Sequence, residues 1–159
     1  VRAGPRTGTV LGKDFVMRLT PLLAALTLCL FVQPASAEWF TADGNALLPG
    51  VPTAAGTSSD GATRVAITCL SGKTPVFVLD TGTEDGPPAG DVTLAIDGQP
   101  FVIEARREDT LWGGTASPRL ISALARGIRL AAVTPGASET IVSLRGSARA
   151  LGEALAGCG

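Results

Sequence analysis

The sequence predicts an α+β, mainly β fold: an antiparallel sheet of five to seven strands with one or two short helices. Short runs of β-branched and aromatic residues alternate with turns rich in glycine, proline and aspartate, which is typical of antiparallel sheets. One of these turns, Asp97-Gly98, is the kind of dipeptide that most strongly favours a β-hairpin. Near the C-terminus, two short segments instead have the caps and apolar spacing of helices.

Residues 17–37 have the three parts of a secretory signal peptide in the required order. Arg18 supplies the positive charge, residues 22–32 form the apolar run, and residues 35–37, Ala-Ser-Ala, are a small-x-small cleavage site. The apolar run is about half of the roughly 20 residues that a membrane-spanning helix needs. We therefore interpret the segment as a cleaved signal and not as an anchor.

Cleavage is expected between Ala37 and Glu38, which places the mature protein in the periplasm or outside the cell, with no membrane span. Residues 1–16 show no periodicity, and an export signal normally stands at the very N-terminus. We therefore interpret residues 1–16 as an upstream extension and Met17 as the initiator.

The expected mature chain, residues 38–159, is long enough for one compact domain with a core of its own. It carries nine basic and thirteen acidic side chains and therefore a net charge of −4. This charge disfavours nucleic acid and anionic membrane surfaces as partners. The acids concentrate in residues 84–109 and the bases in residues 119–149, which predicts either ordinary solvated surface or an acidic and a basic face.

The first part of the mature chain, residues 38–63, is predicted to be rich in loops. Residues 41–63 consist largely of glycine, proline, alanine, threonine and serine, a composition typical of loops. Trp39 and Phe40 precede this stretch and are expected to anchor it in the core. Residues 64–159 are then expected to form a single globular domain.

Residues 64–70 alternate between apolar and polar positions, which predicts a half-buried strand with Cys69 on its apolar face. Residues 75–80 form a short run rich in valine and phenylalanine and are the expected hairpin partner. Three glycines and two prolines within residues 81–90 predict a loop that ends this pairing.

Residues 91–96 and 101–105 flank Asp97-Gly98 and are predicted to form a second hairpin. Further along the chain, residues 128–133 and 140–144 are predicted as strands on either side of a Pro-Gly turn. These four strands complete the expected sheet.

Two helices are predicted in this last part of the chain. Ser117, Pro118 and Gly127 provide an N-cap, a proline at the first helical position and a terminal glycine, so a short amphipathic helix is expected between them. The second helix is expected to begin at Ser147 as its N-cap and to carry two leucines, four residues apart, on one face.

The cysteines predict one disulfide. Cys29 is lost with the signal peptide, so Cys69 and Cys158 remain, and in an oxidising compartment each has the other as its partner. The bridge would join the C-terminal helix to the sheet, and a loop of this length is worth roughly 4 to 5 kcal/mol, less any strain. Because the chain has no Cys-x-x-Cys motif, a structural staple is favoured over a redox pair.

The composition excludes several chemistries. Without histidine, Ser-His-Asp and Cys-His nucleophile systems and histidine-ligated metals or haem are ruled out, and no cofactor is expected. The absence of tyrosine removes another common acid and oxyanion donor. The sequence also lacks nucleophile-elbow, dinucleotide-binding and phosphate-loop motifs.

One motif points to catalysis. Residues 77–83, Phe-Val-Leu-Asp-Thr-Gly-Thr, resemble the active-site signature of aspartic proteases. That chemistry needs two carboxylates that share one proton, so a single copy implies a retropepsin-like homodimer with Asp80 from each chain. The alternative interpretation is a strand end followed by an aspartate turn.

Three further groups of residues are candidate sites. Four carboxylates lie within twelve residues but do not follow the order of an EF-hand loop, so no metal site is expected; they are Asp80, Glu84, Asp85 and Asp91. Arg119 and Arg126 share a face of the predicted helix and would bind an anionic ligand or form salt-linked surface. Trp112 would floor a ligand pocket or anchor the core.

The order of features along the mature chain is distinctive. An early Trp39 is followed by Cys69 on a strand, an antiparallel middle, a closing strand in residues 140–146, an Ala-Leu helix and Cys158. Together with the signal peptide, this order resembles the small exported Gram-negative proteins related to invasion-associated locus B. The resemblance implies a periplasmic, non-enzymatic accessory protein of the envelope and carries over no functional residues.

Three functions from different classes remain open. The first is an exported binding or accessory protein without catalytic activity, expected to be a monomer and to have an envelope protein as a partner. The second is the aspartic protease homodimer that acts through Asp80. The third is a structural component of the envelope.

Overall fold

The computed structural model describes residues 38–43, 51–70 and 74–158. The predicted upstream extension and signal peptide, with Cys29, lie outside the described residues. Ser36–Gly159 is one compact unit. Its elements are β1 (Phe40–Asp43), β2 (Pro52–Thr57), β3 (Arg64–Leu70), β4 (Thr74–Asp80), β5 (Ala89–Ile96), β6 (Gln99–Glu108), β7 (Leu111–Thr115), α2 (Pro118–Arg126), β8 (Arg129–Val133), β9 (Thr140–Ser143) and α3 (Ser147–Ala154).

The strands form one sheet in the order β1-β2-β3-β4-β7-β6-β5-β8-β9, and all neighbours are antiparallel. The predicted fold class is therefore confirmed, with nine described strands in place of the five to seven expected. The predicted hairpin at Asp97-Gly98 joins β5 to β6, and Ile96 pairs with Gln99 across it. Both turn residues have positive φ, 49° and 85°, as a tight two-residue hairpin turn requires.

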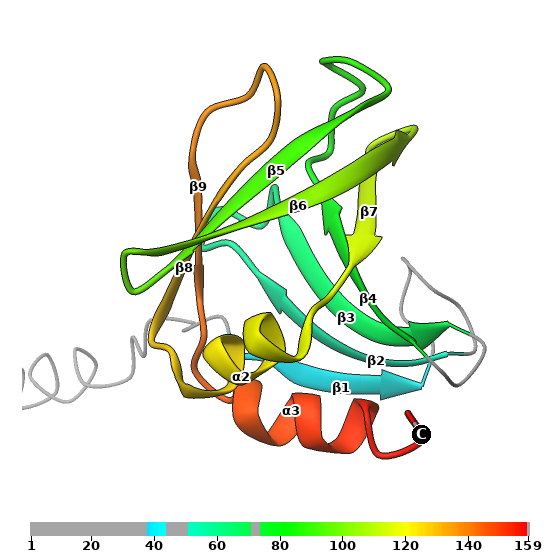
Figure 1. Ribbon diagram of the computed structural model, residues 1–159. Coiled ribbons are helices and arrows are strands. Elements are labelled where there is room, and N and C mark those ends of the chain that lie inside the picture. Colours follow the sequence, from blue (N-terminus) through cyan, green and yellow to red (C-terminus); the bar gives the residue numbers. More distant parts are fainter. Residues whose placement is uncertain (1–37, 44–50, 71–73, 159) are drawn as a thin grey trace, which may run out of the picture. The chain divides into compact units, whose positions relative to one another are not determined.

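The sheet curls until its two ends approach each other, with α2 and α3 at one end of the resulting barrel and the β4–β5 and β8–β9 loops at the other (Figure 1). Ser58, directly after β2, forms an antiparallel bridge with Val142 of β9. Trp39 adds two hydrogen bonds at this seam: its backbone N–H donates to the carbonyl of Arg145 (2.9 Å) and its indole Nε1 to the carbonyl of Ser143 (2.8 Å). The barrel is thus closed partly by a side chain.

The core lies inside the barrel and consists of the inward-facing positions of the strands together with the apolar faces of both helices. Trp39 and Trp112 are its largest members, and neither side chain has any exposed surface. The prediction that Trp39 anchors the N-terminal segment in the core is therefore confirmed. The same prediction is wrong for Phe40, which is 46% exposed.

The prediction of a continuous loop over residues 41–63 is wrong, because β1 and β2 lie within it and pair with the rest of the sheet. The inward positions of β2 are small because the indole of Trp39 fills the space in front of them. An ideal Cβ at Gly56 would lie 2.6 Å from Cε2 of that ring. The described residues of this stretch, 38–43 and 51–63, therefore belong to the same compact unit as the strands and helices that follow.

The sequence also gave no indication of β7, whose central residues are Gly113 and Gly114. A Cβ at Gly114 would lie 2.5 Å from Cγ2 of Ile103 and 2.8 Å from the carbonyl oxygen of Glu104. The glycine is therefore required by the close approach of β6 and not by a turn.

Helix α2 begins and ends as predicted. The hydroxyl of Ser117 accepts a hydrogen bond from the N–H of Leu120, and the N–H of Gly127 donates to Ala123. The predicted role of Ser147 is wrong, because the N-cap of α3 is Gly146 with a φ of 82°.

The buried hydroxyl of Ser147 instead donates to the carbonyl of Leu124 (2.7 Å). This bond joins α3 to the last turn of α2. The two helices are therefore fixed to each other through a backbone carbonyl as well as through their apolar faces.

The predicted disulfide between Cys69 and Cys158 is present, with the two Cα atoms 5.9 Å apart. It joins β3 to the chain just after α3 and so fixes the helical end of the barrel to the sheet. Within the part of the chain that the structure describes, no helix has the length and apolar character needed to cross a bilayer.

Candidate functional site

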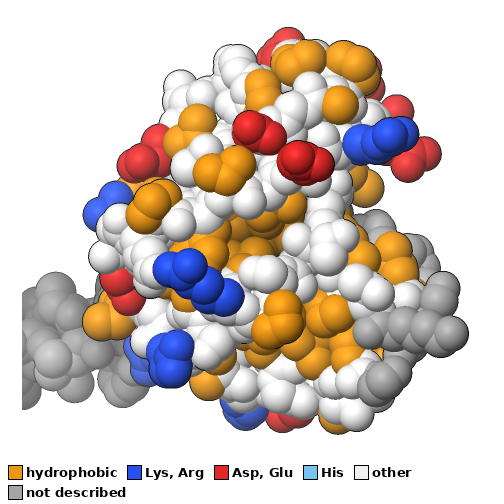
Figure 2. Space-filling view, in the orientation of Figure 1, with side chains coloured by type: hydrophobic (Ala, Val, Ile, Leu, Met, Phe, Trp, Pro, Cys, Tyr) orange, Lys and Arg blue, Asp and Glu red, His pale blue; other side chains and the backbone are white. Residues whose placement is uncertain are grey.

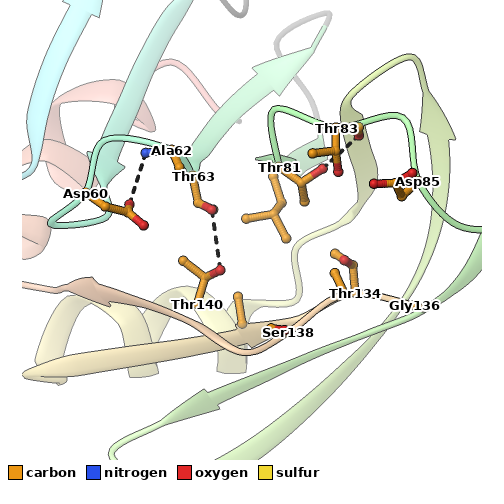
Figure 3. Close-up of a pocket in the computed structure, with 13 residues that line it drawn as sticks. Asp60, Ala62, Thr63, Thr81, Thr83, Asp85, Thr134, Gly136, Ser138 and Thr140 are labelled. Carbon is orange, nitrogen blue, oxygen red and sulfur yellow. Dashed lines mark hydrogen bonds between the residues drawn. The ribbon is translucent and has the colours of Figure 1, made fainter.

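A polar cavity of about 360 Å³ lies at the end of the barrel away from the helices. Three connections surround it: the β2–β3 turn, the segment after β4 and the β8–β9 loop (Figure 3). Its volume is at the lower end of the range of small-molecule sites. The cavity is therefore the right size for a small ligand.

Five threonines line the cavity, and four of them each occupy the first inward position beyond the apolar core on their strand; the fifth, Thr83, lies on the segment after β4. Thr63 precedes Val65, Thr81 follows Leu79, Thr134 follows Ala132, and Thr140 precedes Val142. Because side chains alternate across a strand, residues two apart share a face. The hydroxyls therefore form a polar layer directly above the core, with Leu79 and Ala132 as the apolar floor.

The threonine hydroxyls differ in how they are paired. Thr81 donates to the carbonyl of Thr83 (3.1 Å), whereas Thr63 reaches Thr140 only across a long 3.4 Å contact. Thr134 is 5% exposed, and its hydroxyl has no hydrogen bond to any residue that the structure describes. Buried polar side chains are normally paired, so the Thr134 hydroxyl is open to a partner in the cavity.

Two carboxylates stand on opposite sides of the cavity, Asp60 on the β2–β3 turn and Asp85 on the segment after β4 (Figure 3). Asp60 accepts hydrogen bonds from the hydroxyl of Ser58 and from the backbone N–H of Ala62. These bonds favour its charged form and lower the pKa of the Asp60 carboxyl below its usual value. Asp85 forms no hydrogen bond or ion pair with any described residue, which leaves its carboxylate available.

The segment that carries Asp85 is held by Arg107. The guanidinium donates from Nε to the carbonyl of Pro87 (3.2 Å), from Nη2 to Gly86 (2.9 Å) and from Nη1 to Asp109 (3.0 Å). All three carbonyls bind the guanidinium group and so fix its position. The loop is therefore ordered by a cation that lies outside the cavity lining.

The same segment packs directly on the β8–β9 loop. Gly86 has a φ of 96°, and a Cβ at this position would lie 2.5 Å from the carbonyl oxygen of Pro135. The next residue, Gly136, is also close, since its own ideal Cβ would lie 3.7 Å from Cα of Gly86. Glycine is needed at position 86 for both its backbone conformation and this close approach.

Asp80, the residue of the protease-like motif, ends β4 and is absent from the cavity lining. Its carboxylate accepts a hydrogen bond from the N–H of Gly82 (3.0 Å), and Gly82 has a φ of 68°. This is the geometry of an aspartate turn at a strand end. No observation in the described residues favours a catalytic role over this local one.

The candidate acidic residues for metal binding do not converge. Among the described residues, no group of three or more histidine, cysteine, aspartate or glutamate side chains is close enough to hold an ion. Asp85 lies in the polar cavity, whereas Glu84 and Asp91 are absent from its lining.

The remaining candidates lie outside the cavity. Trp112 is completely buried in the core, as the core-anchor alternative predicts. Arg119 lies over the ring of Phe101, 5.7 Å from its centroid, in a cation–π contact. Arg126 lines a shallow hollow beside Asp97 and Gln99.

On the face seen in Figure 2, acidic side chains gather mainly over the half that holds β5 and β6, and basic ones toward the helical half. The uneven charge of the sequence therefore corresponds to an uneven distribution on this face.

The threonine layer was missed by the sequence analysis, although the sequence contains a signal for it. In each case a threonine stands two residues from an inward apolar residue at the end of a strand. The pattern is local, but only the curled sheet brings the four strand ends together.

Comparisons of this chain with protein-family models, curated proteins and solved structures found no match.

Proposed function

We propose that this protein is an exported, non-enzymatic binding protein that holds a small polar ligand in the cavity at the loop end of its barrel. The observation that carries the proposal is the layer of threonine hydroxyls above an apolar core, with the buried Thr134 hydroxyl unpaired among the described residues. Each hydroxyl offers one donor and two acceptor sites to a ligand. The apolar residues below them exclude water from the floor.

The architecture supports binding without large rearrangement. The wall that carries Asp85 is restrained by Arg107, and the adjoining loops meet at Gly86 and Pro135. A site whose walls are already ordered loses little conformational entropy when a ligand enters. This favours selective binding of one small ligand over adaptable contacts with many.

The periplasmic assignment is part of the same proposal. The signal-peptide pattern of residues 17–37 and the disulfide between Cys69 and Cys158 support it, because disulfides persist in oxidising compartments. Intact mass after expression with export tests it directly. We expect a chain that begins at Glu38 and contains no alkylatable thiol until it is reduced. An unprocessed chain, or two free thiols, would contradict the assignment.

The binding function is tested by screening small polar compounds against the ¹⁵N-labelled mature protein. Compounds that bind should shift the amide resonances of residues 60–63, 81–85 and 134–140 together. Resonances of α2 and α3 at the opposite end serve as an internal control and should not move. If no compound shifts the cavity resonances, or every hit maps elsewhere, the proposal is wrong.

A further inference from the structure

The charge of the cavity lining restricts the chemistry of the ligand. Among the residues that the structure describes, the lining contains two carboxylates, Asp60 and Asp85, and no lysine or arginine. Arg107 directs its donors to the carbonyls of the neighbouring loop and not into the cavity. Two like charges with no cation among the described lining residues favour a cationic ligand over an anionic one.

The kind of cation follows from what else lines the cavity. Within the described part of the chain, no aromatic side chain lines the cavity, and quaternary ammonium groups are recognised by aromatic faces. A primary ammonium group instead has three N–H donors, which match carboxylate and hydroxyl oxygens. The lining therefore fits a primary amine better than a quaternary one.

An independent observation indicates that the ligand also carries hydroxyl groups. The Thr134 side chain is buried on the cavity wall, and its hydroxyl lacks a partner among the described residues. The hydroxyls of Thr63 and Thr140 have only their long contact with each other among the described residues and can exchange it for a shorter hydrogen bond to a ligand. A ligand hydroxyl would satisfy these groups, and an apolar amine would leave them unpaired.

We infer that the cavity binds a small hydroxylated primary amine of the amino-sugar kind, an inference that rests on the proposed binding function. Its ammonium group lies at the carboxylate of Asp85, with Asp60 on the opposite wall, and its hydroxyls contact Thr134 and the other threonines. The ordered wall segment presents Asp85 in place before the ligand arrives.

The test is an NMR titration of the disulfide-bonded mature protein with D-glucosamine, D-glucose, N-acetyl-D-glucosamine and choline. Glucosamine is expected to shift the cavity resonances with an affinity about tenfold above that of the two neutral sugars, because a charge-assisted hydrogen bond is added. Its affinity should fall as salt is raised from low to physiological concentration. Choline is expected to bind more weakly than glucosamine.

Two variants and a matched control separate ligand contacts from structural effects. Asp85→Asn should weaken glucosamine binding about tenfold and leave glucose binding unchanged. Glu84→Gln removes a carboxylate one residue earlier in the chain, outside the cavity lining. It should leave the affinities for glucosamine and for glucose unchanged. Thr134→Val removes an unpaired buried hydroxyl, so it should weaken binding while the melting temperature stays constant or rises.

The outcomes distinguish this inference from the proposed function. The amine inference would be overturned by equal affinities for glucose and glucosamine, by stronger binding of choline, or by an unchanged affinity of Asp85→Asn for glucosamine. The proposed ligand site in the cavity would still stand after any of these results. If none of the four probes and no compound of the broader screen shifts the cavity resonances, both the inference and the proposed function fail.

Discussion

The indole ring of Trp39 lies against the backbone of Gly56, in space that a side chain at position 56 would need. The same ring donates to the carbonyl of Ser143 on β9 (2.8 Å). One side chain thus fills the interior next to β2 and closes the seam between the two ends of the sheet. This position of the Trp39 indole requires a glycine at position 56, seventeen residues further along the chain.

Gly56→Ala is expected to lower the free energy of unfolding by about 1–3 kcal/mol, because the added methyl group overpacks the core against Trp39. Chemical denaturation measures this change. Gly152→Ala is the matched control: a Cβ there meets nothing within 4 Å, and alanine should stabilise the exposed face of α3 by up to about 1 kcal/mol. Equal effects of the two substitutions would show that Gly56 is not constrained by the indole.

The carboxylate of Asp97 connects the β5–β6 hairpin to the start of β8. It accepts hydrogen bonds from the N–H groups of Ile128 (3.0 Å) and Arg129 (2.9 Å). Asp97→Ala should cost about 1.5–3 kcal/mol, the usual range for hydrogen bonds to a charged group. Asp97→Asn keeps an acceptor oxygen and tolerates the positive φ, so its cost should be clearly smaller. Equilibrium unfolding compares the two, and equal losses would contradict this account.

Removing the disulfide with the double substitution Cys69→Ser and Cys158→Ser should lower the free energy of unfolding by up to about 5 kcal/mol, because the bridge closes a long loop in the unfolded chain. Amide hydrogen exchange should accelerate most in α3, next to the lost link. A reducing agent should reproduce the loss in the native protein and have no effect on the double variant. Unchanged protection of α3 would show that its apolar face and Ser147 suffice to hold it.

Asp60 should titrate below its usual value of 3.8, because the Ser58 hydroxyl and the Ala62 N–H stabilise its charged form. Since the folded pKa is the lower one, its contribution to stability is present above 3.8 and is lost as the pH falls through the folded value. Ser58→Ala should raise the pKa of this carboxyl, as measured by NMR titration of its carboxyl carbon. An unchanged titration of the Asp60 carboxyl carbon in Ser58→Ala would contradict this account.

Much of the fold could be predicted because its signals are local. The strand at β3, the Asp97-Gly98 hairpin and the caps of α2 each depend on residues within a few positions of one another. The N-terminal strands and β7 could not be predicted in this way. β2 contains alanine and glycine where strands usually carry large side chains, since the bulk that fills its inner face belongs to Trp39.

The sequence by itself determined the antiparallel, mainly β class, most of the strands, the first helix with its caps and the pairing of Cys69 with Cys158. These features follow from alternation, turn chemistry and the number of available cysteines, which need no knowledge of distant contacts. Only the tertiary structure decided that Asp85 and the four threonines share one cavity. They come from separate strand ends and loops, and it is the curling of the sheet, closed at Trp39, that places them within reach of a single ligand.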